Sequence, residues 1–231
     1  MSMKIDHKQS YIDFGEQFKV DKKIDGYHGS IRLLKDIVRP FKLNNISGKK
    51  IMEIGSGSGR ILKNLIKFKP IKIIGIEPSD AAEVARKNIN SNLLKIKKVK
   101  AENIKFKNEF NYVFSLGVIH HIPQYEKVVK NVNKSLKKGG KFICWVYGYE
   151  GNEIYILIFN NIRRITILLP DFVLRIFCYL INFITYIYGT LCKYLNLPLR
   201  NYFLKVFNKC DFSKRNYIIF DQLNPSYAKY F

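Results

Sequence analysis

Three glycines at every second position follow a short apolar run and an acid in "IMEIGSGSGR", residues 51–60. A turn without side chains lets a ligand come close to the backbone, and glycine adopts the positive φ angles that tight turns need. A helix that begins directly after such a turn offers free amide groups to an anionic part of the ligand. Glu53 places a carboxylate beside the same turn. The segment therefore predicts a small-ligand site built largely from backbone.

Two classes of ligand compete for this turn. A dinucleotide fingerprint needs G-x-G-x-x-G, in which the third glycine lets the helix pack on the strand. Here Gly59 comes one place too early for that pattern, and Arg60 occupies the sixth position. The sequence instead has the spacing E-x-G-x-G-x-G, which argues against an NAD-dependent oxidoreductase.

Short apolar segments alternate with amphipathic ones on both sides of this turn. Such alternation predicts right-handed crossovers and a parallel sheet that is covered on both faces. We expect helices at 29–41, 58–68, 79–91 (capped by Ser79) and 125–138 (stopped by Gly139 and Gly140), and strands at 49–54, 71–76, 94–101, 111–117 and 141–148. The predicted fold is α/β, a Rossmann-like, doubly wound, mostly parallel sheet, followed by an apolar helical cap.

Further motifs follow in order along the predicted strands. Glu77 ends the second strand in "IIGIEPS", and Glu102 and Asn103 follow the third in "KAENIKF". The segments "VFSLGVIHHIP" and "LKKGGKFICWVYG" surround the fourth and fifth strands. With the glycine turn, these motifs make residues 29–148 resemble the class I S-adenosylmethionine-dependent methyltransferases, in particular the small-molecule enzymes of the type 11/12-like group with a helical cap insertion.

The resemblance implies S-adenosylmethionine as the cofactor and no metal. It places Glu77 on the ribose hydroxyls, for which a carboxylate is a suitable double acceptor. It places Glu102 near the adenine amino group, although the family more often has Asp there and a solvated loop acid is the alternative. Glu53 is expected near the cofactor's ammonium and sulfonium charges, or as a cap on the loop amides. The implied cofactor-binding residues are Glu53, Gly55, Ser56, Gly57, Gly59, Glu77, Pro78, Glu102, Asn103, Leu116 and Gly117.

His120 and His121 form the titratable pair just past the predicted fourth strand. Methyl transfer from a sulfonium needs alignment and exclusion of water rather than a nucleophilic side chain. An acceptor hydroxyl, however, benefits from a base, and an imidazole with a reference pKa of about 6.5 serves at neutral pH. Either histidine is thus the candidate catalytic residue, the alternative being that one packs and the other closes the loop. Tyr147 and Tyr149 are candidates for orienting the acceptor. Asn111 stands where the family commonly has Asp, which we expect to affect hydrogen bonding of a loop.

The chain has 231 residues and a formal net charge of +22, with 47% hydrophobic residues. Such charge suits nucleic acid or an anionic membrane, but Lys, Ile and Asn are over-used throughout, which indicates a compositional bias. A nucleic-acid partner is therefore not the leading expectation. The four cysteines are widely spaced and read as reduced thiols, and the polar N-terminus lacks a signal peptide's apolar core, so the expected location is cytoplasmic.

The composition changes after Tyr149. We divide the chain into a lead-in at 1–28, a cofactor domain at 29–149 and an apolar helical cap with a tail at 150–231. Residues 172–192 are long enough to cross a bilayer, but a charge, an Asn and three tyrosines favour a lid or a helix lying on a membrane. Peripheral contact through 154–195 with the inner face of a membrane is one expectation, and a homo-oligomer is left open.

The leading prediction is a methyltransferase acting on a small-molecule acceptor of sugar, lipid-linked or natural-product type. Family members usually continue past the fifth strand to an antiparallel hairpin, and here that hairpin is not recognisable, which would leave a sheet edge uncovered. The alternatives are a truncated cofactor-binding or membrane-associated module without activity, and an RNA methyltransferase.

Overall fold

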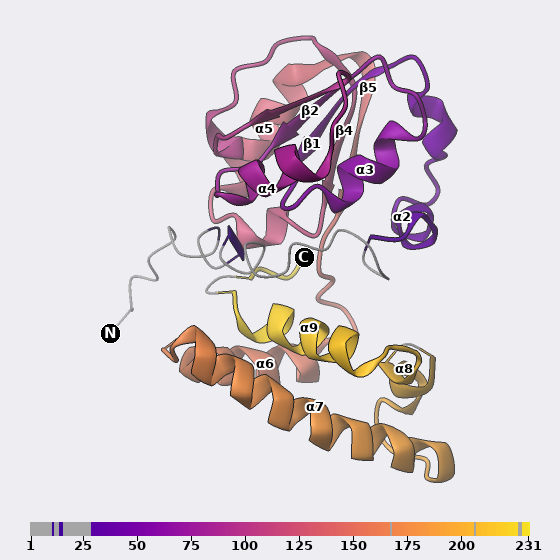
Figure 1. Cartoon of the computed structure of the whole chain (residues 1–231), viewed down its shortest axis with the longest axis vertical. Helices are drawn as coiled ribbons and strands as arrows, with labels where there is room; N and C mark the ends of the chain where they lie inside the picture. The colour runs from indigo at the N-terminus through magenta and orange to yellow at the C-terminus, as the bar shows by residue number, and fades with distance from the viewer. Residues whose placement is uncertain (1–10, 12–13, 16–28, 167, 206, 226–227) are drawn as a thin grey trace. The chain divides into compact units, whose positions relative to one another are not determined.

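The computed structural model describes residues 11, 14–15, 29–166, 168–205, 207–225 and 228–231. The chain forms two compact units, residues 1–151 with 226–231 and residues 152–225 (Figure 1). The predicted lead-in at 1–28 lies mostly outside the described residues. The last six residues group with the first unit, whereas the sequence-based division had joined them to the cap.

The first unit is built around a parallel sheet of five strands in the order β3-β2-β1-β4-β5. The predicted α/β doubly wound fold is confirmed. The strand order reverses between β1 and β4, which is where folds of this kind bind ligands. The strands are β1 (Lys50–Ile54), β2 (Lys72–Ile76), β3 (Leu94–Lys97), β4 (Phe110–Leu116) and β5 (Leu136–Trp145).

Helices cover both faces of this sheet because alternate residues of each strand point to opposite sides. Ile51 and Ile73 pack with α2 (Ile31–Ile37), α3 (Arg60–Ile66) and α4 (Ala81–Asn88). Met52 and Ile74 pack on the other face with α5 (Tyr125–Ser135). The short 3-10 turns are η1 (Leu43–Ile46), η2 (Ala101–Asn103), η3 (Ile119–His121) and η4 (Phe207–Lys209).

Two predicted boundaries are wrong. α5 ends at Ser135 rather than near the Gly139–Gly140 pair, because Leu136 already pairs with Phe110 as the first residue of β5. The register then shifts so that Lys141 pairs with Tyr112, and the glycines lie in this irregularity of the strand. α4 begins at Ala81 with Asp80 as its N-cap, although the Ser79 hydroxyl does accept a hydrogen bond from the Ala81 amide at 3.2 Å.

β5 lies at the edge of the sheet, and no antiparallel strand follows it within the described part of the chain. The end of the chain runs beside the segment after β5 instead. The Phe231 amide donates to the Tyr147 carbonyl at 2.9 Å, and the Tyr149 amide donates to the Phe231 carbonyl at 2.8 Å. This alternation is the hydrogen-bond pattern of a parallel pair. The tail thus covers the chain just beyond the exposed edge.

The second unit is helical and consists of α6 (Glu153–Thr166), α7 (Asp171–Tyr194), α8 (Arg200–Lys205) and α9 (Phe212–Leu223), with η4 between the last two. Its core joins Leu174 and Cys178 of α7 to Phe203 of α8 and to Ile219 and Phe220 of α9. α7 is long and apolar enough to cross a membrane by length and composition. The expected role of this unit as a cap over the acceptor stays a prediction.

Candidate functional site

The glycine turn runs from Gly55 to Gly59, between the carboxyl end of β1 and the start of α3. The amides of Gly55 and Ser56 donate to the Ile76 carbonyl at 2.8 and 3.1 Å, which fixes the turn to the end of β2. Gly55 has a φ of +75°, and a Cβ there would lie 2.3 Å from Cγ2 of Val118. Only glycine therefore fits at this position. At Gly59, with a φ of +92°, a Cβ would come within 2.7 Å of the Ile89 side chain.

Glu77 connects the glycine turn to the end of β2. One carboxylate oxygen accepts the Gly57 amide at 2.8 Å, and the other accepts the Ser79 amide at 3.1 Å and the Ser79 hydroxyl at 2.7 Å. Burial raises the pKa of Glu77, while the hydrogen bonds from Ser79 and Gly57 oppose that change. A carboxylate has about four acceptor positions, so Glu77 keeps capacity for a further donor.

Glu53 is the most deeply buried acid of the site, with 1% of its surface exposed. Burial raises its pKa from 4.5 to about 8; the Ser56 hydroxyl opposes that shift, the neighbouring Glu77 adds to it, and Arg60 opposes it. Among the residues that the structure describes, its Oε2 atom has no hydrogen-bond partner. An acid in this state is mostly protonated at neutral pH, and a nearby cation would favour its ionised form.

The two predicted catalytic histidines lie together in η3, directly after β4 and Gly117. Their ring centroids are 4.2 Å apart, and the His120 ring stacks on Tyr147 at 3.8 Å. His120 is fully buried, whereas 8% of His121 is exposed. The Lys229 amide donates to the His120 carbonyl at 2.8 Å, so the tail also holds this turn. A role for either histidine as a base stays a prediction.

The other predicted cofactor residues lie at the carboxyl ends of their strands, as expected. Pro78 is half-buried beyond β2, and Leu116 ends β4 as a buried residue. Glu102 is half-buried and Asn103 exposed in η2, beyond β3, where the Glu102 carbonyl accepts the Asn131 side-chain amide at 2.8 Å. Asn111 accepts the Lys50 amide through its side chain at 3.1 Å, so it joins β4 to the start of β1. The role of Glu102 near the adenine stays a prediction.

Sequence reasoning did not foresee that the N-terminal segment reaches this edge of the sheet. The ring of Phe14 lies 4.8 Å from that of His121, and Lys100 Nζ lies 4.8 Å above the ring of Tyr11. Gly15 packs so closely on Ser79 that a Cβ would come within 2.7 Å of it. The isolated aromatic residues in an otherwise polar segment were the available signal, but they have no helical or strand period.

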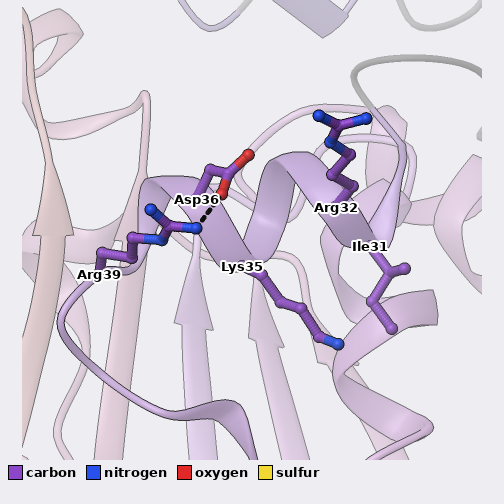
Figure 2. A pocket seen from close by; sticks show the side chains of 5 residues that line it. All are labelled: Ile31, Arg32, Lys35, Asp36 and Arg39. Carbon is purple, nitrogen blue, oxygen red and sulfur yellow. Dashed lines mark ion pairs between the residues drawn. The ribbon is translucent and has the colours of Figure 1, made fainter.

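An open hollow of about 630 Å³ is lined by residues of α2 and by Arg39 just after it (Figure 2). Its lining includes Arg32, Lys35 and Arg39, with Asp36 in ion-pair contact with Arg39 at 3.0 Å. Three cationic side chains in one short stretch of chain favour an anionic binding partner over an apolar small molecule. The hollow therefore differs in character from the buried, glycine-lined edge of the sheet.

Comparison with known proteins gives a family. Residues 52–144 match the family model described as "Methyltransferase domain". Curated relatives named tRNA U34 carboxymethyltransferase include one from Campylobacter jejuni, 28% identical over 142 residues, which cover 59% of this chain and 48% of the relative. Another, from Campylobacter lari, is 27% identical over 178 residues, covering 72% and 60% of the two chains.

The chain thus spans about half the length of the first of these relatives. Among solved structures, an S-adenosylmethionine-dependent methyltransferase from Mesorhizobium loti is similar with a TM-score of 0.44 at 16% identity, covering 52% of this chain and 53% of that one. The YcgJ protein of Bacillus subtilis has a TM-score of 0.49 at 20% identity, with 59% of each chain covered.

The residues at the carboxyl edge fit the cofactor of this family. S-adenosylmethionine carries an ammonium and a sulfonium cation, and the unpartnered oxygen of buried Glu53 is an acceptor that a cation would satisfy. Glu77 retains capacity for hydroxyl donors, and the turn at Gly55–Gly59 leaves the backbone bare. Within the described residues, no cluster of His, Cys, Asp and Glu could hold a metal ion. Residues 52–144 therefore make up a methyltransferase domain, the kind of domain for which S-adenosylmethionine is the methyl donor.

Proposed function

We propose that this chain binds S-adenosylmethionine at the carboxyl edge of its sheet and transfers the methyl group to a small-molecule acceptor of sugar, lipid-linked or natural-product type. The observation that supports this most directly is the hydrogen bond from the Gly57 amide to Glu77, beside the buried, unpartnered oxygen of Glu53. These groups, at the ends of the neighbouring strands β1 and β2, offer acceptors for a hydroxyl donor and for a cation. The cofactor supplies the activated methyl group.

In this proposal the protein aligns the acceptor and receives its proton. Bound S-adenosylmethionine would supply the methyl group to an acceptor oxygen or nitrogen, and a base of the protein would take up the acceptor's proton. His121 is the candidate base, since its ring is the less buried of the pair and lies beside Tyr147, with ring centroids 5.8 Å apart. Packing of Phe14 on the same ring would help to exclude water.

A second candidate acceptor is tRNA. It is favoured by the relatives named tRNA U34 carboxymethyltransferase and by the net charge of +22. Arg32 and Lys35 on α2, with Arg39 just beyond its end, would supply contacts to phosphates. If tRNA is the acceptor, its binding to the protein should weaken steeply as the salt concentration rises. Binding of a small-molecule acceptor should not show this steep dependence. A module that binds the cofactor without turnover is the third alternative.

One labelling experiment separates these candidates. The protein is incubated with cell extract and donor carrying a radiolabelled methyl group, and the extract is then divided into polar small molecules, lipids and RNA. Label in the small-molecule or lipid fraction supports the leading proposal, and ribonuclease-sensitive label supports the tRNA acceptor. The His121→Asn variant should retain binding of S-adenosylhomocysteine but lose most of the transfer. If the protein binds the cofactor but no fraction gains label, the result supports the module that binds the cofactor without turnover.

A further inference from the structure

The outer face of α7 is apolar along the whole helix. Six large side chains on it are 47% to 66% exposed, which is unusual for a helix of a folded unit: Phe172, Ile176, Leu180, Phe183, Ile184 and Ile187. At about 100° per residue these positions fall on one side of the helix. The helix has 24 residues, so this face is about 36 Å long. An exposed apolar surface of this extent marks a binding surface.

The opposite side of α7 is fully used by the helical unit itself. Asn182 is buried there and donates to the Phe212 carbonyl at 2.9 Å, and the Gly189 carbonyl accepts the Asn208 side chain at 2.8 Å. Within this unit, α8 and α9 pack on that side of α7 (Figure 1). The unit therefore completes its own core without the outer face.

A bilayer-crossing orientation of α7 conflicts with its neighbours and with its tyrosines. α9 is packed along α7 and carries Lys214, Arg215 and Asp221, which a crossing helix would draw into hydrocarbon. Tyr179 and Tyr186 each lie about 5 Å along the axis from the middle of the helix. Crossing would place their hydroxyls near the bilayer centre, whereas an in-plane helix keeps every tyrosine at the level of the headgroups.

The charge of this unit suits an anionic surface. Residues 152–225 contain nine Lys and Arg against four Asp and Glu. Asp171 and Asp211 are in ion pairs with Arg175 and Lys214, and the surplus of positive charge lies in the remaining Lys and Arg side chains. Lys193 is exposed and lies on the flank of α7 at the border of the apolar face, whereas the Arg175 guanidinium lies over the ring of Phe220 of α9. Cations that border an apolar face are the arrangement of helices that bind anionic lipids.

We propose that the outer face of α7 binds in the plane of an anionic lipid surface. The apolar side chains enter the boundary between headgroups and acyl chains, and Lys193 meets lipid phosphates or carboxylates. A second copy of this chain would satisfy the apolar face but not the surplus of positive charge, since two positive units would then face each other. The lipid surface accounts for both features. This inference concerns the helical unit and does not depend on the methyltransferase activity.

Flotation of the full chain with lipid vesicles tests the inference. Vesicles of phosphatidylcholine alone are compared with vesicles containing about 30% phosphatidylserine. We expect stronger binding to the anionic vesicles, reduced by salt, and a loss of about tenfold or more in the variant Phe183→Gln/Ile187→Gln. The control variant Ile71→Gln/Leu93→Gln removes two exposed apolar side chains of the other unit and should bind as the wild type does.

Four results would overturn the inference. Failure of the wild type to float with either vesicle would do so, as would equal flotation of the wild type and the α7 variant. Protein that resists extraction by alkaline carbonate would show that α7 crosses the bilayer. Sedimentation equilibrium tests whether a second copy of the chain occupies the face instead. If the wild type is a dimer that does not bind vesicles, and the α7 substitutions dissociate it, the face is a dimer interface. Thermal melts confirm that each variant is folded.

Discussion

Cofactor affinity should depend on pH through Glu53. Burial raises the pKa of this carboxyl from 4.5 to about 8, so ionising it in the folded protein costs about 5 kcal/mol more than in the unfolded chain, at about 1.4 kcal/mol per pH unit. A cationic ligand beside Glu53 needs the ionised form. At pH 7, one pH unit below the raised pKa, deprotonating Glu53 on ligand binding costs about 1.4 kcal/mol. The affinity for the ligand is therefore about tenfold lower than it would be with Glu53 fully ionised.

Titration calorimetry with S-adenosylhomocysteine between pH 6 and pH 8.5 measures this effect, because that ligand retains the ammonium group. We expect the affinity of the wild type to rise about tenfold per pH unit up to about pH 8 and then to level off. Glu53→Gln, which keeps the shape of the protonated acid, should bind weakly and without this rise. Glu126→Gln, an exposed acid on α5, should behave as the wild type.

The same substitution changes the stability of the ligand-free protein. The native state holds the Glu53 proton up to about pH 8 and the unfolded chain loses it near pH 4.5, so this group's contribution is fully present below pH 4.5 and is lost as the pH rises to 8. Denaturant unfolding should therefore show Glu53→Gln gaining stability over the wild type as the pH increases. An affinity that is flat between pH 6 and 8, or that rises equally in both proteins, would refute the reasoning.

Two further predictions concern packing. Gly55→Ala should lose about 1–2 kcal/mol for its left-handed backbone plus about 1–3 kcal/mol for the contact with Val118, whereas Gly48→Ala, which has a φ of +65° and open space, should lose only the first amount. Urea unfolding measures both, and equal losses would show that the Val118 contact is unimportant. Asn182→Ala should cost about 1–3 kcal/mol by leaving the buried Phe212 carbonyl without its donor, and an unchanged unfolding midpoint would contradict that role.

Much of the cofactor edge could be predicted because local rules determine it. The short apolar runs at 49–54 and 71–76 and the glycine turn between strand and helix are set by nearby residues, and both are present in the structure. The end of α5 was not predicted, since its helical pattern continues into residues that Phe110 draws into β5. Pairing with a strand some 25 residues away is a tertiary effect that propensity does not contain.

The surroundings of the histidines depend on segments far apart in the chain. Phe14, Tyr147 and the tail at Lys229 all meet at His120 and His121, and no sequence pattern links these positions. Composition did identify an apolar region after Tyr149. The sequence did not show which side of α7 is buried. The inner side is defined by its packing against α8 and α9, which leaves the outer side exposed.

Binding of S-adenosylhomocysteine to the wild type and to Glu77→Gln at pH 8 tests the central claim most directly, that the glycine turn and Glu77 together hold the cofactor. We predict saturable one-to-one binding by the wild type and binding weaker by about tenfold or more in the variant, since a neutral amide offers the ribose hydroxyls only one acceptor oxygen. Absence of binding heat in the folded wild type, or equal affinity of the two proteins, would contradict the claim.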